Sequence, residues 1–198
     1  MVSELSHDLA TAYGMDEKKA KAATAVAFKR ILDDNNDSFL RKYKKGIYYR
    51  TEKTPFGEYG IDKKKLIQQR CLDGSNGYET GYKILHRLGL TTQMPGGTEI
   101  ATNRAKEKRY DKELGVVVRP PKTVVSMDNL LYLKILDVLA LMDKAPVDAD
   151  DPYGVISDYI EENKLDFIRL VGFASKYYGR DVLEKTAKTA ERMMYATT

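Results

Sequence analysis

The chain has 198 residues, 42% of them hydrophobic and 31% charged, a composition that favours a packed protein over a disordered one. No run approaches the about 20 apolar residues of a membrane span, and the N-terminus lacks the apolar core of a signal peptide. A single cysteine excludes an intramolecular disulfide and fits a reducing cytoplasm, and with only two histidines it cannot form a Cys/His zinc cluster.

The net charge of +4 is divided unevenly along the chain. Residues 1–122 hold 24 Lys and Arg against 16 Asp and Glu, a net of +8, whereas residues 123–198 hold 9 against 13, a net of −4. A polyanion is therefore expected to meet the first part of the chain, with ordinary variation in surface charge as the alternative.

The chain begins with the pattern of two short amphipathic helices. Leu5 and Leu9 share one face of a helix expected over residues 4–13, and Gly14 is a suitable terminator for that helix. Asp16 is a suitable N-cap for the helix that follows.

The second helix is expected over residues 17–32. Its apolar stripe is expected to consist of Ala20, Ala27 and Ile31, with Ala23 and Phe28 nearby. Its other side carries a basic face interrupted by small residues, namely Lys18, Lys21, Ala22, Ala25 and Lys29.

A basic β-hairpin is expected next, over residues 39–50, where aromatic and aliphatic residues flank a Lys-Lys-Gly turn. Residues 39–54 contain six Lys and Arg and one acidic residue. The Thr-Pro-Phe-Gly segment at 54–57 then marks a boundary between a first domain, residues 1–57, and a second domain, residues 58–198.

The second domain is expected to be mixed α/β to about residue 122 and helical thereafter. Helices are expected over 63–72 and 77–88, strands over 98–103 and 116–119, and a charged turn or exposed hairpin loop over 104–112. Residues 127–142 are apolar almost all round, which is typical of a helix buried on several sides, and further helices are expected over 153–163, 166–178 and 181–194. The predicted fold class is α+β.

Two short runs of residues match parts of known catalytic motifs, but the spacing or the secondary structure that those motifs require is missing. The pair Gly74-Ser75 is far from Asp148-Ala149-Asp150, so the nucleotidyltransferase pattern is not met. Asp151 with Glu162-Asn163-Lys164 has the lettering of a metal-dependent nuclease, yet the residues between have helical spacing, and a solvated helix end is the better interpretation.

The remaining chemically interesting residues favour structural roles. Asp33, Asp34 and Asp37 fit an acidic helix end and turn better than a cation site. His86 has no recognisable acidic partner, and Cys71 is expected to be a small buried residue. The sequence therefore predicts a protein that is not an enzyme and that uses no cofactor or metal.

Two helices followed by a basic hairpin are the parts of a winged helix-turn-helix, in which the second helix enters the major groove and the wing lies along the backbone. The DNA contacts expected on the helix are Lys18, Lys21 and Lys29. Those expected on the hairpin are Arg41, Lys42, Lys44, Lys45, Tyr48 and Arg50. A solvated helix face and an ordinary charged hairpin are the alternative. A further helix normally precedes these two, so a trimmed or rearranged domain is expected.

Two segments resemble the AbiEi-type antitoxins. The run Lys45-Gly46-Ile47-Tyr48-Tyr49-Arg50, followed by Pro55-Phe56-Gly57, resembles the wing of that family. The run from Gly81 to Pro95, containing Leu88-Gly89-Leu90-Thr91-Thr92-Gln93, resembles its second signature, and Ile100 to Arg104 fits the strand and basic turn that follow. The resemblance covers roughly residues 39–122 well and the rest of the chain loosely.

The resemblance implies an antitoxin of a type IV toxin–antitoxin system, of the kind tied to abortive phage infection. Such a protein represses its own operon by binding operator DNA and opposes a nucleotidyltransferase toxin, without requiring a stable complex. The basic residues Arg104, Lys106, Lys108 and Arg109 carry over as a surface for neutralisation or further nucleic-acid contact. A stand-alone DNA-binding regulator and a protein-interaction module without DNA binding are the alternatives.

Overall fold

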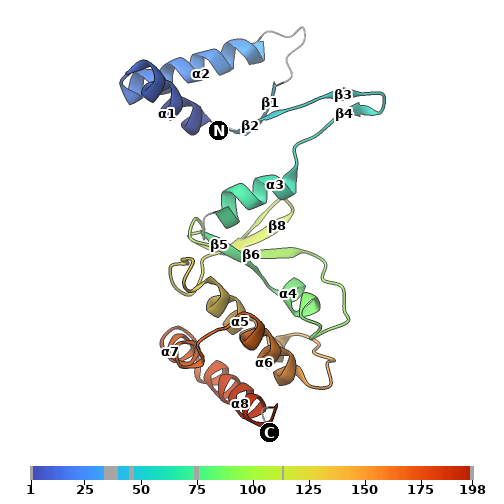
Figure 1. The fold of residues 1–198 in the computed structure, drawn as a ribbon. Helices are drawn as coiled ribbons and strands as arrows, with labels where there is room; N and C mark the ends of the chain where they lie inside the picture. The colour runs from blue at the N-terminus through green and yellow to red at the C-terminus, as the bar shows by residue number, and fades with distance from the viewer. Residues whose placement is uncertain (1, 34–39, 45–46, 74–75, 113, 197–198) are drawn as a thin grey trace. The chain divides into compact units, whose positions relative to one another are not determined.

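The computed structural model describes residues 2–33, 40–44, 47–73, 76–112 and 114–196. The chain divides into two compact units, Met1–Lys63 and Lys64–Thr198 (Figure 1). The boundary expected from the sequence lies slightly earlier, after Gly57. Within the described ranges, no helix combines the length and the apolar character that crossing a membrane requires.

The first unit contains two helices followed by two short antiparallel hairpins. Its elements are α1 (Val2–Tyr13), α2 (Glu17–Asp33), β1 (Leu40–Lys44), β2 (Ile47–Arg50), β3 (Lys53–Thr54) and β4 (Gly57–Glu58). Strand β1 pairs with β2, and β3 pairs with β4. The two helices and the basic hairpin predicted from the sequence are confirmed, whereas a winged helix-turn-helix stays a prediction.

The turn between α1 and α2 forms as its residues predict. Gly14 has a φ of 60°, in the left-handed region that glycine tolerates, and the backbone N–H of Met15 donates to the carbonyl of Ala10 at 3.0 Å. The carboxylate of Asp16 accepts from the backbone N–H of Lys18 at 2.8 Å, as an N-cap does. Local chemistry is therefore sufficient to place this turn.

The buried line of α2 differs from the apolar stripe expected for it. Ala20 and Thr24 are buried and Phe28 is half-buried, whereas Ala27 and Ile31 are exposed, as is Ala23. The hydroxyl of Thr24 donates to the carbonyl of Ala20 at 2.8 Å. Because this bond satisfies its polar group within the helix, Thr24 can be buried where the hydrophobic pattern alone does not place it.

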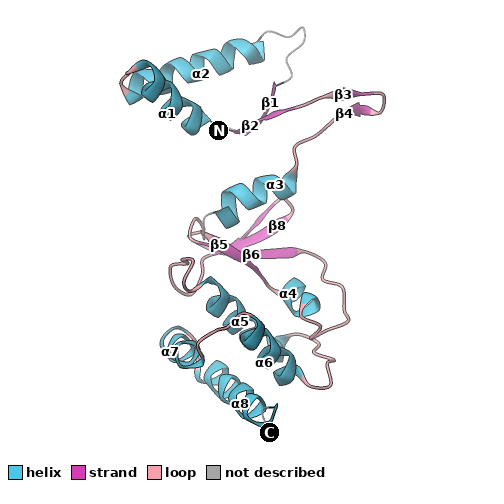
Figure 2. Cartoon of the chain, in the orientation of Figure 1, coloured by secondary structure: helices cyan, strands magenta, loops and turns pink. Residues whose placement is uncertain are grey.

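The described residues of the second unit form a four-stranded mixed sheet, with helices before it, between its strands and after it (Figure 2). Its elements begin with α3 (Lys63–Ile67), the π-helical turn η1 (Gln68–Leu72), β5 (Gly77–Thr80), α4 (Tyr82–Arg87), β6 (Thr98–Thr102), β7 (Arg109–Asp111) and β8 (Val116–Arg119). They continue with α5 (Leu130–Leu141), the 3-10 turn η3 (Met142–Lys144), α6 (Pro152–Glu162), α7 (Phe167–Tyr177) and α8 (Arg180–Ala196). Helices, strands and C-terminal helices thus follow one another as the α+β class predicts.

The strand order is β5-β6-β8-β7, in which β6 and β8 are parallel and the two outer pairs are antiparallel. Alternate side chains of a strand point to opposite faces of the sheet. In β8, Val118 faces Cys71 of η1, whereas the next residue, Arg119, reaches Asp137 of α5 on the other face. The sheet therefore separates two different polar environments.

Two sequence predictions in this unit are wrong. Residues 77–88 do not form one helix, because Gly77 to Thr80 pair with β6 as strand β5 and Gly81, with a φ of 80°, interrupts the chain before α4. Residues 104–112 are not only a loop, because Arg109 to Asp111 form β7 beside β8. Both strands are short, and β7 is largely exposed, so neither shows the alternating pattern of a half-buried strand.

The main core forms around α5, which is buried on several sides as its apolar sequence predicts. Leu133, Ile135, Leu136 and Leu139 are all 0% exposed. Residues of α4, α6, α7 and α8 join this cluster, for example Leu85, Ile160, Leu170 and Val182. The C-terminal helices are therefore held to the sheet through one apolar helix.

Gly77 sets how closely η1 approaches the sheet. A Cβ at this position would lie 2.4 Å from the carbonyl oxygens of Ala101 and Cys71. We expect Gly77→Ala to lower the free energy of unfolding of the second unit by about 1–3 kcal/mol, since backbone atoms must move to admit the methyl group. Denaturant unfolding followed by alkylation of Cys71 measures this change, because the one cysteine reports on this unit alone.

Gly172 of α7 is the matched control for this substitution. A Cβ there meets nothing within 4 Å, so Gly172→Ala is expected to raise stability by about 0.5–1 kcal/mol through helix propensity. Equal effects of the two substitutions would show that close packing at Gly77 does not limit the fold.

Candidate nucleic-acid interface and a pocket lined by arginines

The lysines of α2 form an exposed row. Lys18, Lys21 and Lys29 are all exposed, and their spacing places them on one side of the helix. Lys21 lies 4.0 Å from Glu17, a weak contact between two exposed groups. Within the described residues, Lys18 and Lys29 make no ion pair. These ammonium groups are consequently available to a polyanion.

The residues predicted on the hairpin have different surroundings. Arg41 pairs with both carboxylate oxygens of Glu58, at 2.7 and 3.1 Å, and this bond raises its pKa. Arg50 lies 4.0 Å from Glu52, and both are exposed. Lys42 is exposed. Of the other two hairpin lysines, Lys44 is described only in its backbone and Lys45 lies outside the described residues.

The hairpin is joined to α2 by aromatic packing. The rings of Phe28 and Tyr48 stack with their centroids 4.7 Å apart. Tyr48 was predicted to contact DNA, and its ring now has a structural role as well, because it holds β2 against α2. Because of this stacking, the hairpin packs against the helix that carries the lysine row.

The four basic residues predicted in the second unit are not equivalent. Lys108 donates to Glu99 at 3.1 Å, and Lys106 is exposed. Arg104 and Arg109 instead line a pocket with a volume of about 110 Å³. The structure therefore separates the predicted surface into two outer lysines and two arginines at a cavity.

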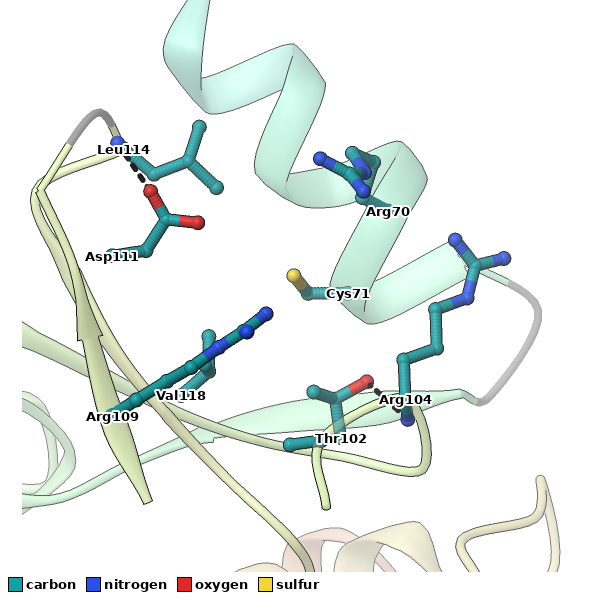
Figure 3. Close-up of a pocket in the computed structure, with 9 residues that line it drawn as sticks. Arg70, Cys71, Thr102, Arg104, Arg109, Asp111, Leu114 and Val118 are labelled. Atoms are coloured by element: carbon teal, nitrogen blue, oxygen red, sulfur yellow. Dashed lines mark hydrogen bonds between the residues drawn. The ribbon is translucent and has the colours of Figure 1, made fainter. Parts of the chain in front are cut away.

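The pocket also contains two residues that sequence reasoning did not assign to a site. Arg70 and Cys71 come from η1, and they meet Arg104 and Arg109 across the end of the sheet (Figure 3). In Figure 3 the Cys71 sulfur faces the hollow and Arg109 extends toward it. No sequence signal links these residues, because η1, the turn after β6 and strand β7 are brought together only by the sheet.

The thiol of Cys71 responds to this environment. Burial raises its pKa, and the nearby positive charges of Arg70, Arg104 and Arg109 oppose the rise without cancelling it. Cys71 is therefore a protonated, buried residue at neutral pH, which agrees with the structural role predicted for it and not with that of an activated nucleophile.

The aspartates that match parts of catalytic motifs, Asp148 and Asp151, form hydrogen bonds that stabilise the fold. The carboxylate of Asp148 accepts from the backbone N–H and hydroxyl of Thr92, at 3.0 and 2.6 Å. Asp151 caps α6 by accepting from Gly154 at 2.9 Å and pairs with Arg192 at 2.5 Å. Within the described residues, no group of three or more His, Cys, Asp or Glu side chains could hold a metal ion.

A buried polar cluster lies on the other face of the sheet. Asp137 of α5, 3% exposed, accepts hydrogen bonds from the hydroxyls of Tyr78 at 2.8 Å, Thr80 at 3.0 Å and Tyr178 at 2.9 Å, and from the guanidinium of Arg119. Burial and the adjacent carboxylate raise the pKa of both tyrosines. Every partner donates to one carboxylate, so the cluster joins the sheet to the helices.

Comparison of the chain with protein-family models, curated proteins and solved structures gives no match.

Proposed function

We propose that this protein is a non-catalytic antitoxin that binds DNA through its first unit and opposes a nucleotidyltransferase toxin through its second. The observation that carries the DNA-binding part is the exposed lysine row of α2 beside the hairpin β1–β2. Lysines at this spacing reach phosphates along one groove, and a hairpin packed on the same helix adds contacts that position the protein.

Small residues on α2 support this proposal. Ala22 and Ala25 are exposed beside the lysines, so the helix can approach a groove closely without displacing bulky side chains. Arg41 is committed to Glu58, whereas Lys18 and Lys29 have no such partner among the described residues. We therefore assign the principal phosphate contacts to the helix and secondary contacts to Lys42 and Arg50.

The non-catalytic part of the proposal is supported by the surroundings of the reactive residues. Asp148 and Asp151 stabilise chain turns and a helix terminus, and the pKa of the Cys71 thiol is raised. Residues 81–95, which resemble the second signature of the antitoxin family, also stabilise the fold. Gly89, with a φ of 76°, ends α4, and Thr92 is held by Asp148.

A cellular experiment tests both parts together. The protein is co-expressed with a nucleotidyltransferase encoded beside its gene, which the proposal requires, in cells that carry a reporter under its own upstream region. We expect the natural chain to restore growth and repress the reporter. The triple substitution of Lys18, Lys21 and Lys29 by Gln should restore growth but lose repression, because only the DNA contacts are removed.

The outcomes separate the alternatives. Repression without growth rescue would indicate a stand-alone regulator, and growth rescue without repression by the natural chain would remove the DNA-binding part. If neither is seen, the antitoxin proposal is wrong.

A further inference from the structure

The arginines of the second unit fall into two groups. Most have a partner within the unit. Arg87 pairs with Glu79 at 2.6 Å, Arg180 with Glu184 at 2.9 Å and Arg192 with Asp151 at 2.5 Å. Arg119 pairs with Glu99 and Asp137, and Arg169 lies over the ring of Tyr132, 5.1 Å from its centroid. Arg70, Arg104 and Arg109 have no such partner among the described residues, and all three line the same pocket.

One acidic residue, Asp111, lines the pocket together with these arginines. Asp111 directs a carboxylate oxygen to the backbone N–H of Leu114 at 3.1 Å (Figure 3). Three arginines and one aspartate therefore line the hollow, and Arg109 extends toward it (Figure 3). The lining has a net positive charge, which attracts an anion, and guanidinium groups donate strong hydrogen bonds to an oxyanion.

The size of the pocket limits what the anion can be. Its volume is about 110 Å³, smaller than the cavity of about 150 Å³ that admits benzene, a size that suits a tetrahedral oxyanion better than a nucleoside. Arg104 and Arg109 are exposed, so the pocket opens to solvent on their side. A planar guanidinium matches two oxygens of a phosphate at once, which favours phosphate over a simple halide ion.

We propose that Arg70, Arg104 and Arg109 form a binding site for a single phosphate group, either free phosphate or the phosphomonoester at the end of a nucleic-acid strand. The π-helical turn η1 is part of the site, since it places Arg70 and Cys71 over the sheet edge, and π-helical turns are frequent at functional sites. The site lies within the second unit and does not depend on DNA binding by the first.

Cys71 supplies a reporter for this site. It is the one cysteine of the chain, and its sulfur faces the hollow. A bound phosphate blocks access to the sulfur and disfavours the thiolate through its negative charge, so alkylation by iodoacetamide slows on both grounds. The reaction is followed by mass spectrometry on the full-length chain at constant ionic strength.

Three ligands distinguish the sources of the phosphate: inorganic phosphate, a 5′-phosphorylated trinucleotide and the same trinucleotide with a 5′-hydroxyl. At ten times its Kd, a ligand leaves about one molecule in eleven unoccupied and slows alkylation about tenfold. Protection by inorganic phosphate alone identifies free phosphate as the ligand. Protection by the phosphorylated trinucleotide, with or without inorganic phosphate, identifies a strand end.

Substitutions then test the assignment of residues. Arg109→Gln and Arg70→Gln are each expected to weaken phosphate binding by about 10- to 100-fold, since each removes a charge-assisted hydrogen bond. Arg180→Gln, on the exposed surface of α8, is the control and should leave binding unchanged. Because a substitution near η1 could disturb the fold, Arg109→Lys is included, and it should retain the charge and part of the affinity.

Equal protection by the hydroxyl and phosphorylated trinucleotides would overturn the proposal in favour of non-specific polyanion binding. Absence of protection by any ligand at millimolar concentration would also overturn it. Neither outcome bears on repression by the first unit, which is measured with the α2 variants.

Discussion

Replacing Asp137 by Asn is expected to lower the free energy of unfolding of the second unit by about 3–5 kcal/mol, because it breaks a buried ion pair without changing the volume of the side chain. Tyr78, Thr80, Tyr178 and Arg119 all donate to the Asp137 carboxylate. An amide offers only one accepting oxygen, and its NH₂ group then faces buried donors. Alkylation of Cys71 in increasing denaturant measures the change.

Two further substitutions separate the ion pair from the hydrogen bonds around it. Tyr78→Phe removes one donor and is expected to cost about 1–2 kcal/mol, because three other donors remain on the carboxylate. Asp158→Asn, on the exposed side of α6, is the matched control and should change stability by less than about 0.5 kcal/mol. If Asp137→Asn costs no more than Tyr78→Phe, the charge of Asp137 is not what stabilises the cluster.

The Asp137 cluster also shows where sequence reasoning stops. Asp137 lies in an apolar segment whose hydrophobic pattern predicts a buried helix, and that helix is confirmed. The pattern cannot show why a carboxylate is tolerated there. Its partners come from β5, β8 and the end of α7, and only the folded sheet brings them together.

The sequence predicts local structure correctly where the conformation depends on one short segment only. The left-handed conformation of Gly14 and the N-cap at Asp16 follow from the properties of these residues alone, and both are confirmed. Gly89, with a φ of 76°, ends α4 in the same conformation. Strand β5 was missed because its conformation depends on pairing with β6 and on the absence of a side chain at Gly77.

The two basic regions differ in how far they could be predicted. The lysine row of α2 follows from helical spacing and needs no knowledge of the fold. In the second unit, Arg104 and Arg109 were singled out by the resemblance, but Arg70 joins them only because η1 packs on the sheet. A row on one helix can be predicted from the sequence, whereas a pocket formed by three segments cannot.

The two regions also imply different kinds of anion recognition. The lysines of α2 lie along an exposed helix, a geometry that suits a repeating row of phosphates. Three arginines line a pocket of about 110 Å³, a size that suits one phosphate group. The two proposals therefore assign a duplex to the first unit and a single phosphate group to the second.

Binding of the natural chain to duplex DNA from its own upstream region is expected to fall steeply with salt. If about six phosphates are neutralised, log K against log salt has a slope of about −5. Substituting Gln for Lys18, Lys21 and Lys29 should make the slope shallower by about 2–3, since each phosphate contact contributes about 0.9. Fluorescence anisotropy of labelled DNA over a salt series measures both slopes.

The control for this experiment removes the same charge elsewhere. Lys164, in the turn after α6, and Lys176 and Lys188, in α7 and α8, are exposed. Their replacement by Gln lowers the net charge of the chain equally. If the contacts are local to α2, this control keeps the slope of the natural chain, because counterions are released only where phosphate meets a lysine. Equal slopes for the two triple variants would show that DNA responds to the overall charge of the chain, and the α2 row would then have no specific role.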